Sequence, residues 1–230
     1  MTAGTPGPQD AEATARVDLL SAMCRLDALG LNRGSTGNAS LRFGDGMLVT
    51  PSGMGAGEMT VDDLVWLGDD GRARGPWAPS SEWHFHRAIH AARPDLPAVL
   101  HTHSVNATAL ACLGRPLPPF HYMVAVAGGA DVPCVPYHLF GSASLSQAVA
   151  TAMRDRRACL LAHHGLVAAG ATVAEALKLA IEIEALCETF LKLLPMGEPR
   201  LLDAAQMDEV IAKFRGYGRA ARAGSSPASS

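Results

Sequence analysis

Two histidine-bearing stretches carry the residue types from which metal sites are built. His101 and His103 follow a short apolar run, and residues two apart on an extended strand point to the same side of the sheet. A second apolar run, Leu160–Ala162, leads into His163, His164 and a turn glycine. Adjacent residues on a strand point opposite ways, so we expect one ligand here, His164, and a structural hydrogen bond from His163. Three neutral imidazoles around an open position are a common arrangement for catalytic zinc.

The remaining histidines are less suited to a metal site. His84 and His86 fall on a predicted helix, where residues two apart point to nearly opposite sides. His86 and His90 are four apart and could share an ion, but the glutamate of a zinc-protease helix motif is missing, so packing or surface placement is favoured. His121 and His138 lie beside aromatic residues and prolines, and we expect them at most to line a pocket.

A single carboxylate, Glu82, is the candidate acid or base. It follows Ser80 and Ser81 where a helix is expected to begin, and a helix N-terminus favours bound anions. The serines could hold a phosphate while Glu82 faces the metal. The local sequence alone equally describes a serine N-cap followed by a first-turn acid. The segments 36–38 and 50–53 are ordinary turns that could also present donors to a phosphate.

The elements that must position these residues follow from apolar periodicity and turn residues. Helices are predicted over about 10–29, 82–92, 107–112, 142–154, 172–194 and 203–214. Strands are predicted over 39–43, 47–50, 64–67, 98–103, 121–125, 131–135 and 158–162. Strands and helices intermix without a regular alternation. The predicted fold is therefore one α/β domain, residues 10–219, with a mixed sheet covered by helices on both faces. The tails, 1–9 and 220–230, are expected to be disordered.

Composition excludes several classes of function. Hydrophobic residues make up 48% of the chain and charged residues 18%, as in ordinary globular proteins. The net charge of −3, with no basic stripe, argues against nucleic-acid binding. Five dispersed cysteines without a CxxC pair indicate reduced thiols. Neither a signal peptide nor an apolar run of membrane-spanning length is visible, so we expect a cytoplasmic protein that does not bind membranes.

Taken in chain order, the motifs resemble the class II aldolase/adducin family. Each is weak by itself, but the ordered set is specific and runs in register from about residue 15 to 218. The first group comprises Ser35–Ser40, Thr50–Gly53, Pro79–Trp83, His101–His103 and His163–Leu166. The likeness continues through His121–Met123, Ala127–Gly129, Pro136–Tyr137, Phe140–Gly141 and Lys213–Gly218.

This resemblance implies a fold and a set of roles. The fold would be a three-layer α/β/α sandwich around a mixed, largely antiparallel sheet. His101, His103 and His164 would bind Zn²⁺, or another divalent ion such as Mn²⁺ or Co²⁺, with Glu82 beside it as acid/base. Tyr122 would reach the site from a neighbouring subunit of a homotetramer. The substrate phosphate would lie among Gly37, Asn38, Ser52, Gly53, Ser80 and Ser81. The aldehyde pocket would be formed by Phe140, Phe214 and Tyr217.

The implied reaction is cleavage of a ketose 1-phosphate, such as L-fuculose 1-phosphate, to dihydroxyacetone phosphate and an aldehyde. Alternatives on the same scaffold are a 5-deoxyribulose- or methylthioribulose-1-phosphate aldolase or dehydratase, and a pentulose-phosphate 4-epimerase. Glu82, in place of the aspartate expected of the epimerase, favours aldol cleavage, as do Tyr122 and the Phe214/Tyr217 pair. A non-catalytic, adducin-like module can dispense with metal ligands, whereas this chain keeps all three. An iron oxygenase with His-x-His is disfavoured by the many predicted helices.

Overall fold

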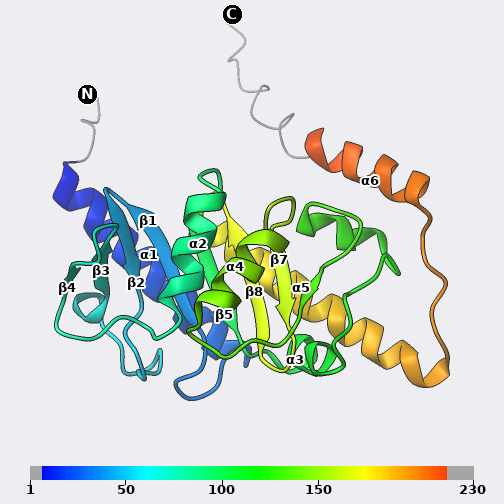
Figure 1. Cartoon of the computed structure of the whole chain (residues 1–230), viewed down its shortest axis with the longest axis horizontal. Coiled ribbons are helices and arrows are strands. Elements are labelled where there is room, and N and C mark those ends of the chain that lie inside the picture. Colours follow the sequence, from blue (N-terminus) through cyan, green and yellow to red (C-terminus); the bar gives the residue numbers. More distant parts are fainter. Residues whose placement is uncertain (1–6, 217–230) are drawn as a thin grey trace, which may run out of the picture.

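The computed structural model describes residues 7–216 and contains one eight-stranded sheet (Figure 1). Its strands are β1 (Asn38–Phe43), β2 (Gly46–Val49), β3 (Val65–Gly68), β4 (Ala73–Arg74), β5 (Ala98–Thr102), β6 (Cys134–Val135), β7 (Ala158–Leu161) and β8 (Gly165–Gly170). Their order across the sheet is β4-β3-β2-β1-β5-β8-β7-β6. Neighbouring strands are antiparallel except β6 and β7, which are parallel. The expectation of a mixed, largely antiparallel sheet is confirmed.

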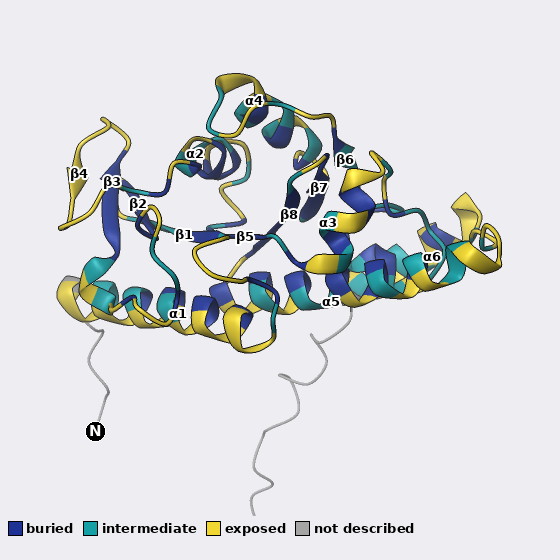
Figure 2. Ribbon diagram, turned by 90° about the horizontal axis from the view of Figure 1, so that it is seen from below, coloured by how far each residue is buried: buried dark blue, intermediate teal, exposed yellow. Residues whose placement is uncertain are grey.

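Helices cover both faces of the sheet, which makes three layers (Figure 2). The α-helices are α1 (Pro8–Ala28), α2 (Trp83–Ala92), α3 (Val105–Cys112), α4 (Ala143–Ala152), α5 (Val173–Leu193) and α6 (Ala204–Gly216). Short 3₁₀ helices are η1 (Val61–Asp63), η2 (Tyr122–Ala127) and η3 (Leu194–Met196). Helices α1 and α5 run along one face, and α2 and α4 lie over the other. Within the described residues, no helix is both long and apolar enough to cross a membrane.

The alternation of side chains along β5 divides the core in two. Ala98 and Leu100 pack into the layer of α1, α3 and α5, while Val99 packs with residues of α2 and α4. His101 shares the side of Val99, and its ring meets Phe85 of α2 edge-on at 5.5 Å between centroids. The polar end of an otherwise apolar strand is thus directed into the space beneath α2.

Two expectations for the second half of the chain are wrong. The segment 121–125 forms 3₁₀ helix η2 instead of a strand, with His121 Nδ1 accepting a hydrogen bond from Met123 N–H at 3.2 Å. This side-chain cap, together with Gly128 at φ 92°, turns the backbone away from the extended conformation. Strand β8 was not foreseen, because small residues dominate Gly165–Gly170.

The chain ends differ from the expected boundaries or lie beyond the described residues. Helix α1 begins at Pro8, before the expected domain boundary at residue 10, and proline is favoured in a first helical turn. Helix α6 ends at Gly216 and packs against η2. The expected tail 220–230, residues 1–6 and Tyr217 lie outside the described range.

Candidate metal centre

Four side chains from distant parts of the sequence converge on one point. Glu82, His101, His103 and His164 each offer a ligand atom, and these atoms all lie within 4.8 Å of one another. The Nε2 atoms of His101 and His103 are 2.9 Å apart. Glu82 lies between His101 and His164, with Oε2 at 3.2 Å from His101 Nε2 and Oε1 at 3.1 Å from His164 Nε2. The structure thus gathers the three expected ligands and the expected carboxylate.

The sheet places two of these imidazoles. His101 ends β5, opposite Val167 of β8, and its Nδ1–H donates to the Leu166 carbonyl at 2.9 Å. This bond fixes the ring with Nε2 facing the cluster. His103 follows the end of β5, and its backbone N–H approaches Asn32 Oδ1 at 3.4 Å.

The third imidazole comes from a turn, which corrects the expectation that the last histidines lie on a strand. Strand β7 ends at Leu161, so His163 and His164 form the connection to β8. His163 has a φ of 57°, and no side-chain hydrogen bond of its ring is found within the described residues; its ring meets Tyr137 edge-on. The left-handed residue turns the chain, so that His164 faces the cluster.

Gly165 is a site residue that the sequence analysis treated only as a turn glycine. A Cβ there would lie 2.3 Å from the Thr102 carbonyl oxygen and 3.3 Å from His101 Cε1. The absence of a side chain therefore lets β8 approach β5 at the metal cluster.

The carboxylate also sits differently from the expected helix turn. Helix α2 begins at Trp83, so Glu82 is the N-cap residue and not a first-turn acid. Its side chain makes no cap hydrogen bond and is 7% exposed. Oε2 accepts a hydrogen bond from Asn38 Nδ2 at 2.9 Å. The cap position thus directs the carboxylate away from the helix and into the cluster.

Burial and charge set the protonation of this cluster. Burial would raise the pKa of Glu82, but the charges and hydrogen bonds of His101 and His164 outweigh it and lower that pKa below its usual value. Burial, followed by the charges of His101 and His164, lowers the pKa of His103 to about 4. At neutral pH the carboxylate is therefore ionised and His103 is neutral, which are the forms that bind a cation.

The donor set fits a divalent metal ion. Three imidazole nitrogens with one carboxylate oxygen suit zinc and similar transition metals. Glu82 Oε1 is buried and faces His164 Nε2 at 3.1 Å without a well-aligned hydrogen bond. A cation beside this oxygen would offset the cost of burying it.

The turns expected to hold a phosphate lie together beside Glu82. Ser52 N–H donates to the Ala78 carbonyl at 3.0 Å, and Ser80 N–H donates to the Thr50 carbonyl at 2.9 Å. Thr50 in turn accepts from Ala39 N–H through its hydroxyl at 3.1 Å. These bonds join the segments that carry the expected phosphate residues, which are Gly37, Asn38, Ser52, Gly53, Ser80 and Ser81. One N–H of the Asn38 side chain is already engaged by Glu82.

The residues expected around the aldehyde are not gathered by the described chain alone. Phe140 is 61% exposed. A Cβ atom at the next residue, Gly141, would lie 3.1 Å from the Ser81 carbonyl oxygen. The loop of Phe140 therefore borders the phosphate turns. Tyr122 lies in η2, 51% exposed, and Phe214 packs from α6 against the core on the α5 side.

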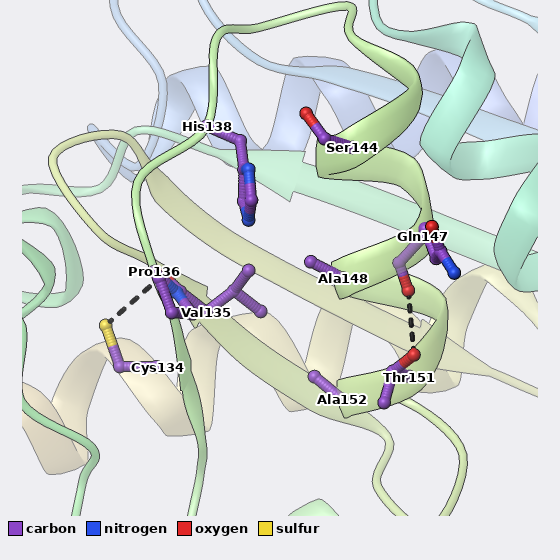
Figure 3. Close-up of a pocket in the computed structure, with 9 residues that line it drawn as sticks. All are labelled: Cys134, Val135, Pro136, His138, Ser144, Gln147, Ala148, Thr151 and Ala152. Carbon is purple, nitrogen blue, oxygen red and sulfur yellow. Dashed lines mark hydrogen bonds between the residues drawn. The ribbon is translucent and has the colours of Figure 1, made fainter.

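A separate cavity of about 500 Å³ lies between β6 and α4 (Figure 3). Its lining comes from the segment of Cys134, Val135 and His138 on one side and from Ser144 and Gln147 of α4 on the other. His138 thus lines a pocket, as expected from the sequence. None of the gathered imidazoles lines this cavity, so it is distinct from the metal cluster.

The fold and the cluster together define a class of protein: a metal-dependent enzyme whose α/β/α sandwich holds three imidazoles and one carboxylate. Residues 17–191 match the family model described as Class II Aldolase and Adducin N-terminal domain. The chain belongs to the class II aldolase/adducin family. With its intact cluster it is a metal-dependent class II aldolase, an aldehyde-lyase, and not a non-catalytic module.

Several relatives share most of their length with this chain. A 5-methylthioribulose-1-phosphate/5-deoxyribulose-1-phosphate aldolase of Rhodospirillum rubrum is 50% identical over 213 residues, covering 93% of this chain and 96% of the relative. An L-fuculose phosphate aldolase of Haemophilus influenzae is 44% identical, covering 87% and 93%. A solved structure of L-fuculose 1-phosphate aldolase superimposes with a TM-score of 0.85 at 35% identity, covering 88% of this chain and 96% of that one.

Proposed function

We propose that this aldolase cleaves 5-methylthioribulose 1-phosphate or 5-deoxyribulose 1-phosphate between C3 and C4. The enzyme cleaves a ketose 1-phosphate in either case, but the sequence analysis favoured L-fuculose 1-phosphate. The higher identity to a relative named for the 5-substituted pentuloses supports the alternative instead. The products would be dihydroxyacetone phosphate and a two-carbon aldehyde that bears hydrogen or a methylthio group.

The observation that carries the reaction is the ionised Glu82 carboxylate within 3.2 Å of two imidazoles. Cleavage removes the proton of the C4 hydroxyl, breaks the C3–C4 bond and leaves its electron pair on the three-carbon fragment as an enediolate. A divalent ion held by His101, His103 and His164 would supply Lewis-acid stabilisation of that negative charge. The Glu82 carboxylate takes up the C4 hydroxyl proton as the bond breaks and then delivers it to C3, which completes the triose phosphate.

The phosphate turns would fix the register of the substrate. Segments 50–53 and 78–82 are tied by backbone hydrogen bonds, and Glu82 follows directly on Ser81. An anion held by Ser52 and the two serines therefore presents the following carbons toward the carboxylate. Holding the reacting atoms in this way lowers the entropic part of the barrier.

An apolar loop supports a small aldehyde without hydroxyl groups. Tyr137, Leu139 and Phe140 are all more than 60% exposed, and their loop touches the Ser81 segment. A methyl or methylthio group gains from contact with such a surface, whereas the extra hydroxyl of the fuculose-derived aldehyde would lose hydrogen bonds to water.

The assembly, the metal and the cellular location complete the proposal. We propose a homotetramer in which Tyr122 serves the site of a neighbouring subunit as a proton donor or acceptor. The half-exposed position of Tyr122 on η2 supports this. We propose Zn²⁺ as the ion, from the three-imidazole donor set. The free thiols of all five cysteines support a cytoplasmic location.

A comparison of three substrates tests the substrate assignment. The zinc-loaded enzyme is incubated with 5-methylthioribulose, 5-deoxyribulose and L-fuculose 1-phosphates, and dihydroxyacetone phosphate is trapped by its reduction. We expect kcat/KM for either 5-substituted pentulose to exceed that for L-fuculose 1-phosphate about tenfold or more. A preference for L-fuculose 1-phosphate would show that the substrate is the one the sequence analysis favoured. Absence of the triose phosphate from all three reactions would refute aldol cleavage.

A further inference from the structure

Three buried polar side chains between α2 and β1 have no part in the reaction described so far. Ser40 is fully buried on β1, and His86 and His90 of α2 are 0% and 4% exposed. Buried polar groups cost free energy unless they are hydrogen-bonded. Their hydrogen bonds form a continuous path from the interior of the protein to Glu82.

Short hydrogen bonds connect these side chains into one chain. His90 Nε2 lies 2.8 Å from Ser40 Oγ, which lies 2.7 Å from His86 Nδ1. His86 Nε2 lies 2.6 Å from Asn38 Oδ1, and Asn38 Nδ2 donates to Glu82 Oε2 at 2.9 Å. Every link is buried.

The spacing of strand and helix explains why these residues interlock. Asn38 and Ser40 are two apart on β1 and point to the same side, while His86 and His90 are four apart on one side of α2. Two residues of strand rise about 6.6 Å and four residues of helix about 6 Å. The two pairs therefore run alongside each other and alternate as donors and acceptors.

The orientation of the Asn38 amide determines where each proton lies. Its Nδ2 donates to Glu82 Oε2, so Oδ1 is the atom that faces His86 Nε2. That oxygen requires a proton on His86 Nε2. Burial lowers the pKa of His86 well below its ordinary value, so the ring is neutral and Nδ1 accepts from the Ser40 hydroxyl. The Ser40 oxygen can then accept only from His90 Nε2–H. All donors consequently point toward Glu82, and aligned hydrogen bonds strengthen one another.

We infer that Asn38 and His86 are positioning residues, which hold Glu82 through a directed hydrogen-bond chain that begins at His90. The inference rests on the proposed role of Glu82 as the proton donor. Glu82 has no cap hydrogen bond to its own helix, so the Asn38 amide, backed by His86 and Ser40, holds Oε2 together with the His101 ring, whose Nε2 lies 3.2 Å away. Asn38 was expected to bind phosphate, but its side chain serves the carboxylate.

The first test determines which ring nitrogen of His86 carries a proton, and it does not require the enzyme to turn over. Protein labelled with ¹⁵N at histidine is studied by NMR at pH 7, with and without zinc, and the ring signals are assigned by their loss in His86→Gln and His90→Gln. We expect a neutral His86 with its proton on Nε2 and none on Nδ1. A proton on Nδ1, or on both nitrogens, would overturn the direction of the chain. Because this readout is independent of catalysis, its failure is distinct from failure of the proposed reaction.

The second test asks whether His86 acts through Glu82. His86→Leu should lower kcat about tenfold, leave KM for the sugar phosphate within about twofold and leave the zinc content unchanged. Ser40→Ala, a smaller change one link further away, should lower kcat less. His84→Gln, an exposed residue on the same helix, is the matched control and should match the wild type.

A double-mutant cycle separates positioning from general support of the fold. In the Glu82→Gln background, His86→Leu should cause no further loss of the residual activity, because the group it orients is already gone. An equal loss in both backgrounds would mean that His86 only supports the structure. A kcat for His86→Leu close to the wild-type value would also refute the inference.

Discussion

At the scale of single residues, Glu82 shows how position changes the chemistry of a common side chain. A polar side chain just before a helix often caps it, but this carboxylate is turned into the interior, where His101 and His164 oppose the effect of burial and keep its pKa low. It is ionised and oriented before substrate binds. Such a group needs little rearrangement to accept or return a proton at a carbon held beside it.

Replacing Glu82 by glutamine tests this role. Glu82→Gln keeps the volume and a hydrogen-bonding oxygen but removes the negative charge and the ability to take up and release a proton. We expect carbon–carbon cleavage to fall about 100-fold or more, because positioned acid–base groups contribute on that order. Zinc content measured by elemental analysis should remain stoichiometric, since His101, His103 and His164 are retained. Wild-type turnover in this variant would rule out proton transfer by Glu82.

His90 makes the stability of the fold depend on pH. Burial, reinforced by the charge of Arg42 and partly offset by the Leu96 backbone, lowers the pKa of His90 to about 4 from an ordinary value of 6.5. As the pH falls below 6.5 the unfolded chain binds the proton first, so stability is present above that pH and is lost as the pH falls toward 4. The loss from this group approaches about 3 kcal/mol.

Urea denaturation of the metal-free protein between pH 7 and pH 4.5 measures that loss. In His90→Gln the free energy of unfolding should be lower at pH 7 but should fall less steeply with acid, because only the contributions of other buried groups such as His86 and His103 remain. Identical pH slopes for the wild type and the variant would contradict a neutral, buried His90.

The sequence indicates which residues meet, but not how they are held. The His-x-His spacing places His101 and His103 on one side of a strand, and the structure gathers them with His164 and Glu82. The network of Ser40, His86 and His90 was not foreseen, because it depends on α2 lying across β1. The matched spacing of two in the strand and four in the helix was visible, but spacing alone cannot tell which helix covers which strand.

At the scale of elements, the contact between β5 and β8 sets the geometry of the cluster. Gly165 has no room for a side chain, since a Cβ would meet the Thr102 carbonyl at 2.3 Å. The two strands must therefore stay close where His101 and His103 leave the sheet.

Gly165→Ala should force these strands apart. We expect a loss of about 2 kcal/mol in the free energy of unfolding, as for other overpacked sites, and about tenfold weaker zinc binding. Both are measurable, by urea denaturation and by competition with a chromogenic chelator. Gly57→Ala is the matched control, because a Cβ atom at that position would have no neighbour within 4 Å and the φ of Gly57 is not positive. A zinc affinity unchanged by Gly165→Ala would show that the strands can move without disturbing the ligands.

Element types were predictable where the apolar periodicity was strong. Helices α1, α2, α4 and α5 and the β1–β2 hairpin lie close to their predicted ranges. The errors are local. The segment predicted as a strand at 121–125 is a 3₁₀ helix capped by the His121 side chain, and β8 was missed because its small residues give no clear strand pattern. The pairing of β8 between β5 and β7 joins residues far apart in sequence, and local patterns do not encode it.

At the scale of the whole molecule, the proposed tetramer predicts shared active sites. Glu82→Gln and Tyr122→Phe should each be nearly inactive alone. If Tyr122 acts across a subunit boundary, co-refolded mixtures should regain up to about a quarter of wild-type activity, because some sites combine the intact residue of each partner. Sedimentation analysis checks that mixed oligomers have formed.

The same mixture can also fail in an informative way. If mixed oligomers form but stay inactive, Tyr122 belongs to the site of its own subunit. If the protein sediments as a monomer and still cleaves its substrate, the shared-site proposal is wrong. Mixing either variant with His84→Gln controls for subunit exchange, because that residue is exposed and outside the cluster.

The loop that carries Tyr137 and Phe140 is separate from the strands that carry the imidazoles. If this loop lines the aldehyde pocket, as proposed, substitutions there should alter the preferred aldehyde without moving the imidazoles. A library confined to this loop would therefore be expected to yield aldolases of new selectivity at undiminished metal content. Such a division would let similar scaffolds act on different sugars.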